Sequence, residues 1–303
     1  MPTARTLELA LDYRCNLRCI GCRACEDRGE RLAPERAAAL LREAREAGAK
    51  CAWLGGGEPT LREDLPALVR RARALGFDEV VVQTNAMRLA YPAYARALVE
   101  AGVTEVRVNA KSARAEVHDR LSGEAGAHAL LLRALENLGP LGVRVTADVL
   151  LARSTAPHLD ETVAFFADRG VRRFALWLLY GSDVRDGCDS EVPRIADIVP
   201  AVERAHAIAR SRGLELVSFH TPPCTLPQAL RATWQPAREL GIEVVDPGGH
   251  RFALQDSPFE GGGHVEGCAG CVFRDRCGGP RADYLRLHGA GEFRALSSAG
   301  EGR

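Results

Sequence analysis

Short apolar runs alternate with amphipathic segments along most of the chain. The apolar runs are rich in Val, Leu and Ile and are interpreted as buried strands, at 7–11, 51–54, 79–83, 105–108, 143–151 and 172–179. The segments between them carry apolar residues at helical spacing and most end at a glycine, at 34–47, 64–75, 91–101, 127–138, 159–169 and 195–212. Six strand–helix units in succession predict an α/β fold with a buried parallel sheet.

The pattern changes after Gly213. One further strand is predicted over 214–219, and the runs 242–245 and 251–254 flank the turn-forming stretch Asp246 to His250, which indicates a hairpin. A last helix is predicted over 281–288. We therefore expect a main domain over 1–213, a small hairpin-plus-helix domain over 214–290, and a mobile tail over 291–303 that is rich in small and charged residues.

Composition narrows the class of function. The 40 basic and 40 acidic residues give a formal charge of zero, so there is no basic field to attract nucleic acid or an anionic membrane. No stretch approaches the roughly 20 apolar residues of a membrane span, and residues 1–10 lack the apolar region of a signal peptide. The ten cysteines cluster at metal-binding spacings, which favours reduced thiolates and a cytoplasmic location over disulfides in a secreted protein.

Three cysteines, Cys15, Cys19 and Cys22, follow the first predicted strand on a loop. Their spacing suits an iron–sulfur cluster, and three thiolates on a four-iron cubane leave one iron open to bind another group. Cys25 extends the run, so Cys19, Cys22 and Cys25 form an alternative ferredoxin-like triad. A four-cysteine zinc site is a third interpretation.

A glycine motif then distinguishes these interpretations. Gly55, Gly56, Gly57 and Glu58 end the second strand, where glycines let the backbone approach a ligand closely. With both motifs in order, each after a strand, the chain resembles the radical S-adenosylmethionine (radical SAM) enzymes. The resemblance implies a partial (β/α)6 TIM-like barrel with its site at the carboxyl ends of the strands. It implies a 4Fe-4S cluster on Cys15, Cys19 and Cys22 whose open iron binds SAM, and it places the glycine motif near the SAM amino group.

Two other strand ends are candidates for holding SAM. Thr84 and Asn85 close the third strand, where the family often has Thr-Asn-Gly and this chain has Ala86. Asn109 closes the fourth strand, where many members have a serine near the SAM ribose or carboxylate, and Ser112 is a second possibility. For Asn85 and Asn109, a turn at the strand end is an equally good interpretation.

Two residues of the expected barrel mouth carry further chemistry. Cys188 lies in the loop after the sixth strand, where an exposed thiol would be able to donate a hydrogen atom to a substrate radical, a catalytic role. Lys111 is interpreted as a solvated loop lysine, with contact to a substrate carboxylate as the alternative. His118, in what is predicted to be a loop, is assigned a turn or capping role.

A second group of cysteines lies in the C-terminal part, at Cys224, Cys268, Cys271 and Cys277. Four thiolates make a closed metal site. The spacing resembles part of the twitch or SPASM-like extension of radical SAM enzymes, which implies a second, auxiliary 4Fe-4S cluster. Where that pattern continues with another cysteine this chain has Arg281, and zinc is the alternative occupant.

These features predict a radical SAM enzyme that reductively cleaves SAM to a 5′-deoxyadenosyl radical and abstracts a substrate hydrogen. We expect it to oxidise or rearrange a small metabolite or a carrier-delivered peptide, with the auxiliary cluster in electron transfer and a flavodoxin- or ferredoxin-type donor. The preference for a small molecule rests on the first strand beginning near Thr6, without a preceding peptide-recognition domain. A maturase of ribosomally made peptides is the alternative, and a non-catalytic iron–sulfur or zinc protein is less favoured.

Overall fold

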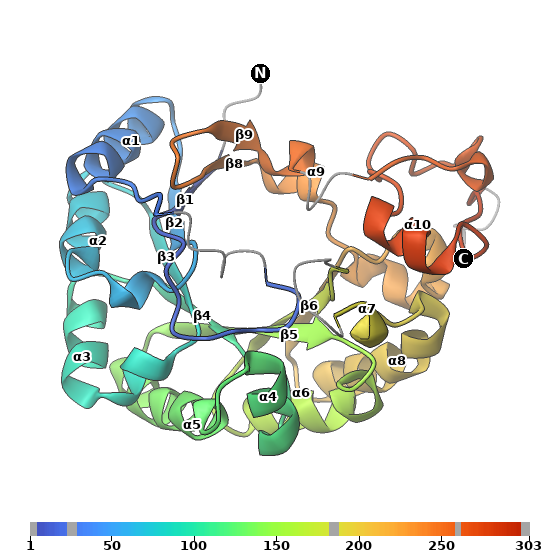
Figure 1. The fold of residues 1–303 in the computed structure, drawn as a ribbon, viewed down its shortest axis with the longest axis horizontal. Coiled ribbons are helices and arrows are strands. Elements are labelled where there is room, and N and C mark those ends of the chain that lie inside the picture. Colours follow the sequence, from blue (N-terminus) through green and yellow to red (C-terminus); the bar gives the residue numbers. More distant parts are fainter. Residues whose placement is uncertain (1–4, 23–28, 182–187, 258–261, 298–303) are drawn as a thin grey trace.

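Nine strands form one sheet in the computed structural model, which describes residues 5–22, 29–181, 188–257 and 262–297 (Figure 1). The sheet has the order β7-β6-β5-β4-β3-β2-β1-β8-β9, and every neighbouring pair is parallel except β8 with β9. The strands are β1 (Thr6–Ala10), β2 (Cys51–Gly55), β3 (Glu79–Thr84), β4 (Glu105–Asn109), β5 (Arg144–Leu151), β6 (Arg173–Leu178), β7 (Glu215–Phe219), β8 (Ile242–Val245) and β9 (Arg251–Ala253). The sheet curves round an open space without closing, which confirms the predicted partial α/β barrel.

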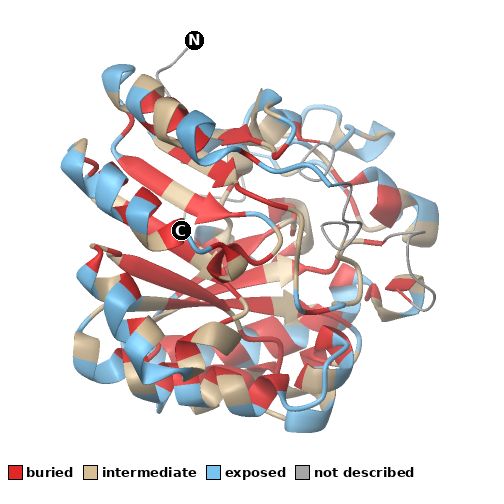
Figure 2. Ribbon diagram, turned by 60° about the vertical axis from the view of Figure 1, so that its left-hand side comes forward, coloured by how far each residue is buried: buried red, intermediate tan, exposed pale blue. Residues whose placement is uncertain are grey.

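Helices cover the outer face of this sheet, so their exposed sides face solvent while the strands are largely buried (Figure 2). They are α1 (Pro34–Glu46), α2 (Leu65–Ala74), α3 (Pro92–Glu100), α4 (Ala115–Ser122), α5 (Ala127–Leu138), α6 (Leu159–Ala167), α7 (Cys188–Glu191), α8 (Ile195–Ser211), α9 (Ala237–Leu240) and α10 (Ala282–His288). Pro34 and Pro92 begin α1 and α3, at a position where the missing N–H has no helical partner to lose. None of the described helices has the length and apolar character needed to span a bilayer.

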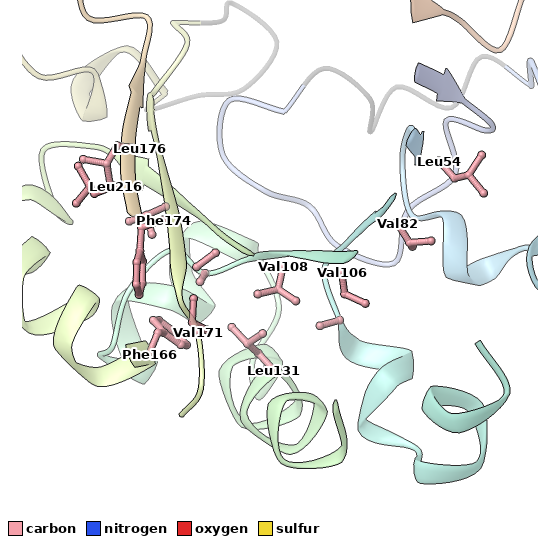
Figure 3. Close-up of a cluster of buried hydrophobic side chains, with 14 of the residues drawn as sticks. Leu54, Val82, Val106, Val108, Leu131, Phe166, Val171, Phe174, Leu176 and Leu216 are labelled. Atoms are coloured by element: carbon pink, nitrogen blue, oxygen red, sulfur yellow. The ribbon is translucent and has the colours of Figure 1, made fainter. Parts of the chain in front are cut away.

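Side chains alternate between two environments along each central strand. On β4, Val106 and Val108 point to the same side of the strand, where Leu131 of α5 lies, and are fully buried in the main core (Figure 3). Glu105, Arg107 and Asn109 line an interior cavity of about 440 Å³ instead. The inner face of the sheet is therefore polar and aromatic, although the apolar runs suggested strands that are hydrophobic throughout.

The C-terminal strands differ from the predicted separate domain. β7, assigned to the small domain, pairs with β6, and the predicted hairpin joins the opposite edge of the sheet because β8 pairs with β1. The main sheet therefore does not end at residue 213. The physical reason is that β1 and β6 would otherwise be edge strands with unpaired backbone groups, and parallel pairing satisfies them.

The predicted mobile tail is also ordered where the structure describes it. Phe293 is buried and packs edge-to-face against Tyr284 of α10. Val272 N–H donates to the Leu296 carbonyl at 3.0 Å. Residues 291–297 therefore pack against the cysteine-containing segment, because one aromatic side chain among the small residues finds a buried position.

Candidate active site

The loop that carries Cys15, Cys19 and Cys22 leaves the carboxyl end of β1, and all three thiols are half-buried. Burial raises the pKa of Cys15 to about 12, and the negative charges of Glu58 and the other two cysteines act in the same direction. Leu17 N–H donates to Cys15 Sγ at 3.4 Å and partly opposes this. The free thiol is thus held protonated, and binding of a metal must displace its proton.

The glycine motif holds this loop from one side. Gly57 N–H donates to the Asp12 carbonyl at 2.7 Å, and Glu58 N–H donates to the Arg14 carbonyl at 2.8 Å. A Cβ on Gly57 would lie 2.3 Å from Arg14 O, and Gly56 combines a φ of +115° with a Cβ position 2.7 Å from Asp12 O. The close approach that requires these glycines is therefore to the chain's own cysteine loop.

Glu58 joins the ends of β2 and β3. Its side chain is buried, and Oε1 accepts hydrogen bonds from Thr60 N at 3.0 Å, Thr60 Oγ1 at 2.6 Å and Thr84 Oγ1 at 2.7 Å. Oε2 accepts from Asn85 N at 2.6 Å. Burial raises the pKa of the Glu58 carboxyl, while these four donors oppose the rise. The carboxylate thus braces the two strand ends through protein contacts.

A helix that the sequence analysis had assigned to a loop holds the cysteine loop from the other side. Arg18 N–H donates to the Ser122 carbonyl at 3.0 Å, and Ile20 N–H donates to the Leu121 carbonyl at 2.9 Å. Both acceptors lie at the end of α4. Gly123 follows with a φ of +66°, and a Cβ there would lie 2.5 Å from Arg18 O. That glycine is the sequence signal that could have revealed α4, because a left-handed residue commonly ends a helix.

The remaining strand-end residues have distinct placements. Asn85 Nδ2 donates to Asn16 Oδ1 at 2.7 Å and lies 4.0 Å from Cys15 Sγ, so Asn85 is at the cysteine loop. The Thr84 hydroxyl donates its hydrogen bond to the Glu58 carboxylate. Asn109 lines the interior cavity, whereas Ser112 is fully buried and its Oγ accepts the Arg114 N–H at 3.1 Å. Asn109 is therefore the better placed of the two candidates on this segment.

Cys188 is not the exposed thiol that we expected. Its side chain is fully buried, and Sγ donates to the Tyr180 carbonyl at 3.2 Å. A Cβ on Gly21 would lie 3.1 Å from Cys188 Sγ, so the cysteine packs against the loop between Cys19 and Cys22. The predicted exposure of the Cys188 thiol is wrong, because the residue is buried at the start of α7. Its role as a hydrogen-atom donor stays a prediction.

A charged and aromatic group forms the inner wall of the barrel. Arg107 binds Asp148 through Nη2, and Asp148 also accepts from Gln83 Nε2 at 3.0 Å and Trp177 Nε1 at 3.1 Å. The Arg107 guanidinium lies 4.7 Å from the Trp53 ring centroid. These contacts neutralise Asp148 and leave aromatic faces beside the cavity.

The four C-terminal cysteines line one small cavity and none forms a disulfide. Burial is the main cause that raises the pKa of Cys277 to about 11, and the nearby Cys224, Cys268 and Cys271 contribute to the same rise. Backbone N–H groups are directed at the sulfurs: Gly279 N lies 3.4 Å from Cys277 Sγ, and Leu296 N lies 3.5 Å from Cys271 Sγ. Such N–H···S contacts suit a thiolate-bound cluster.

The donor set at the four C-terminal cysteines is compatible with a cubane and with zinc, because thiolates bind both. Among the described residues, no three His, Cys, Asp or Glu side chains are arranged to hold one ion.

Arg281, which stands where the family pattern has another cysteine, connects this region to the barrel. Its side chain is buried and donates to the carbonyls of Leu178 at 3.0 Å and Leu179 at 2.7 Å, at the end of β6. It also pairs with Asp283, which accepts the Gly181 N–H at 2.7 Å. The departure at this position is visible in the sequence, whereas the contacts of Arg281 depend on the tertiary fold.

The fold and site together define a partial α/β barrel with a cysteine loop braced at the carboxyl edge of its strands. The family model for the radical SAM superfamily matches residues 12–166, which is more than half of the 303 residues. The chain therefore belongs to the radical SAM superfamily.

Curated relatives agree with this assignment. An AdoMet-dependent heme synthase from Oleidesulfovibrio alaskensis is 26% identical over 80% of this chain and 62% of its own length. The mycofactocin maturase MftC from Mycobacterium ulcerans is 34% identical over 55% of this chain and 45% of its own length. A PqqA peptide cyclase from Rhodopseudomonas palustris is 31% identical over 56% of this chain and 46% of its own length. The chain thus spans about half the length of these relatives.

Solved structures share the fold. SuiB from Streptococcus suis bound to S-adenosylmethionine superposes with a TM-score of 0.71 at 16% identity, over 97% of this chain and 76% of SuiB. Native anSMEcpe with bound AdoMet superposes with a TM-score of 0.67 at 14% identity, over 95% of this chain and 92% of that one. These similarities are similarities of fold.

Proposed function

We propose that the chain cleaves S-adenosylmethionine reductively at a 4Fe-4S cluster held by Cys15, Cys19 and Cys22. The observation that carries the proposal is the two-sided attachment of the cysteine loop, to the glycine motif and to the end of α4. When bound, the cluster and SAM supply a radical able to abstract a hydrogen atom. The protein's own residues position the thiols, and the barrel wall shields the substrate from water.

SAM would lie between the cysteine loop and the ends of β2, β3 and β4. Asn85 at the loop and Asn109 at the cavity are suited to hydrogen-bond a polar ligand there. The glycines and Glu58 act on SAM indirectly, because they fix the loop that carries the cysteines. Gly55 contributes through its carbonyl, which accepts the Leu11 N–H at 2.9 Å.

A peptide side chain is the substrate that the comparisons favour. Two curated relatives are named for peptide maturation or cyclisation, and SuiB is solved with its precursor peptide SuiA. The cavity of about 440 Å³, with aromatic faces at Trp53 and Trp177, is large enough for one side chain. A small metabolite is the second candidate, because the heme synthase relative covers more of this chain.

An auxiliary 4Fe-4S cluster on Cys224, Cys268, Cys271 and Cys277 completes the proposal. Four thiolates leave no iron open, and the directed N–H groups would tune its potential. We assign it electron transfer during substrate oxidation, with a flavodoxin- or ferredoxin-type protein as the external donor.

Anaerobic reconstitution tests the catalytic site. Alanine at Cys15, Cys19 or Cys22 is expected to abolish 5′-deoxyadenosine formation under dithionite, whereas Cys25→Ala is expected to retain it. Cys25 itself lies outside the described residues. An active Cys15→Ala with an inactive Cys25→Ala would identify the ferredoxin-like triad as the ligand set.

Metal analysis tests the auxiliary site. Two cubanes require about eight irons per chain, whereas a zinc site would give about four irons and one zinc. Cys224→Ala is expected to fold and to cleave SAM but to yield no oxidised product. Loss of thermal stability together with SAM cleavage would instead assign the four cysteines a structural role.

A further inference from the structure

A second cavity, of about 70 Å³, lies between the barrel and the C-terminal cysteine group, and the proposed reaction does not use it. We call it the arginine pocket. Among the described residues, no Asp or Glu lines it. The pocket therefore presents cationic and neutral polar groups to a ligand. Its lining includes His220, Trp234, Arg238, Gln255, Arg276 and Arg281.

The arginine pocket adjoins the interior cavity at the open side of the barrel, between the edge strands β7 and β9. The His220 ring packs edge-to-face against Trp177 of the interior cavity, with centroids 5.4 Å apart. At three places, one residue lines the interior cavity and a residue one or two positions away lines the arginine pocket. One extended ligand can therefore occupy both cavities. The three pairs are Phe219 and His220, Leu240 and Arg238, and Leu254 and Gln255.

Arg238 carries the uncompensated positive charge of this pocket. Arg276 and Arg281 each form an ion pair with a carboxylate that is not part of the lining. Arg238 is exposed and has no hydrogen bond or ion pair to any described residue. Lys111 differs, because it is 2% exposed and therefore not the solvated loop lysine that the sequence suggested. The Arg238 guanidinium is thus a cation that a ligand can reach.

The chemistry of the pocket suits a carboxylate on a peptide. A guanidinium presents a planar fork of N–H donors that binds both oxygens of one carboxylate. The side-chain amides of Gln235 and Gln255 are able to donate to and accept from a peptide backbone. A volume of about 70 Å³ has room for one small charged group rather than for a second large side chain.

We propose that the arginine pocket is a second substrate subsite, in which Arg238 binds a carboxylate close to the side chain that occupies the interior cavity. This inference rests on the proposed peptide substrate. The carboxylate belongs to an acidic side chain or to the C-terminus of the peptide. A phosphate is a poorer match, because only one of the three guanidinium groups lacks a carboxylate partner.

The three tryptophans of the chain report the two cavities separately. Trp53 and Trp177 line the interior cavity, and Trp234 lines the arginine pocket. Reconstituted protein labelled with 5-fluorotryptophan therefore gives three ¹⁹F NMR signals, which are assigned by replacing each tryptophan with Phe. The probes are the blocked dipeptides Ac-Phe-Glu-NH2 and Ac-Phe-Gln-NH2, because they differ in one carboxylate.

The glutamate probe is expected to shift the Trp234 signal and at least one interior signal with one common dissociation constant. Arg238→Gln is expected to weaken its binding about 10-fold and to leave the glutamine probe unchanged, and Arg238→Lys to recover part of the loss. The fold is expected to persist, because Arg238 has no partner to lose among the described residues. Arg42→Gln, at an exposed position of α1, is the matched control.

A second pair of probes distinguishes the two sources of the carboxylate. Ac-Phe-OH has a free C-terminal carboxylate, and Ac-Phe-NH2 has an amide in its place. A loss of affinity in Arg238→Gln for Ac-Phe-OH but not for Ac-Phe-NH2 assigns the pocket to a peptide C-terminus. The same loss for Ac-Phe-Glu-NH2 alone assigns it to an acidic side chain.

The subsite is overturned if the Trp234 signal responds to neither carboxylate probe, or if Arg238→Gln binds both with the affinity of the wild type. Both outcomes concern peptide binding alone, and formation of 5′-deoxyadenosine by the wild type tests the proposed function independently. A protein that forms no 5′-deoxyadenosine but shows the Arg238-dependent Trp234 shift would contradict the proposed function and retain the subsite.

Discussion

Glu58 links the glycine motif to the third strand through hydrogen bonds that all run towards one carboxylate. Its four donors come from Thr60, Thr84 and Asn85, on both sides of the β2–β3 boundary. Because every partner donates, the ionised form is the one that satisfies them. The link that Glu58 makes between the ends of β2 and β3 therefore depends on the negative charge of its carboxylate as well as on its shape.

Replacing Glu58 by Gln is expected to lower the free energy of unfolding by about 1.5–3 kcal/mol, because the amide NH2 group confronts the Asn85 N–H in place of an acceptor. Urea unfolding at constant slope measures the change. Glu63→Gln, an exposed neighbour, serves as the control. A midpoint equal to that of wild type would show that the carboxylate is not a brace.

His118 gives a pH dependence whose sign follows from its burial. Its pKa in the folded protein is well below the unfolded value of about 6.5, so below that pH the unfolded chain binds a proton that the folded chain does not. Stability is therefore expected to fall as the pH drops from about 6.5, by up to about 1.4 kcal/mol per pH unit.

The comparison that isolates His118 is urea unfolding of wild type and His118→Gln at several pH values between 7.5 and 5. Effects of acid on the cluster are common to both proteins and cancel in the difference. The wild type is expected to lose stability more steeply than the variant. Parallel slopes would mean that His118 is protonated in the folded protein.

At the scale of elements, the cysteine loop depends on two chain segments that approach it too closely for any Cβ. Gly57→Ala puts a methyl group 2.3 Å from Arg14 O and adds no backbone strain, since its φ is not positive. We expect the loop to shift and the iron content to fall from about eight to about four per chain, with the helices retained.

Gly139→Ala is the matched control, because a Cβ there meets no atom within 4 Å. Iron and sulfide analysis after reconstitution, with circular dichroism for the fold, distinguishes the two variants. Full iron loading of Gly57→Ala would contradict this prediction, because it would show that the cysteine loop accommodates a methyl group at position 57.

The sequence predicted those elements whose signals are local. The strand β8 and the helix α5 begin and end where expected, and the cysteine loop follows β1, because apolar runs and flanking glycines mark them within a few residues. The helix α4 was missed because it has only eight residues and its last two carbonyls bind the cysteine loop. No local pattern reveals such contacts.

The sequence also did not predict which distant segments pair in the sheet. The hairpin was predicted correctly as a hairpin, but its position beside β1 depends on which edge of the sheet stays open. The site shows the same division. Cys15, Cys19, Cys22 and the glycine motif are predicted as site residues from their spacing alone. The partners of Glu58 and the burial of Cys188 follow from the tertiary fold.

Across the whole molecule, the two cysteine groups are connected through the end of β6. Gly279 contacts Cys277, and two residues later Arg281 binds the carbonyls of Leu178 and Leu179. A Cβ on Gly21 would lie 2.8 Å from Leu179 Cδ1, so the cysteine loop packs against the same segment. A change at one cysteine group therefore reaches the other through few contacts.

Arg281→Lys tests this connection, because lysine keeps the charge but cannot bind two carbonyls and Asp283 with one planar fork. We expect the free energy of unfolding to fall by about 2–3 kcal/mol. Released contacts at Leu179 should also loosen the loop between Cys19 and Cys22. Iron is therefore expected to leave both cysteine groups faster under a chelator, with release from the two sites followed separately in Cys15→Ala and Cys224→Ala backgrounds.

Arg42→Lys, at an exposed position of α1, controls for the substitution itself. Faster release from the C-terminal group alone would confine the role of Arg281 to its own segment. Release from both groups at the wild-type rate would contradict the connection altogether. Faster release from Cys15, Cys19 and Cys22 is the decisive result, because Arg281 binds the carbonyls of Leu178 and Leu179, and Leu179 packs against that loop at Gly21.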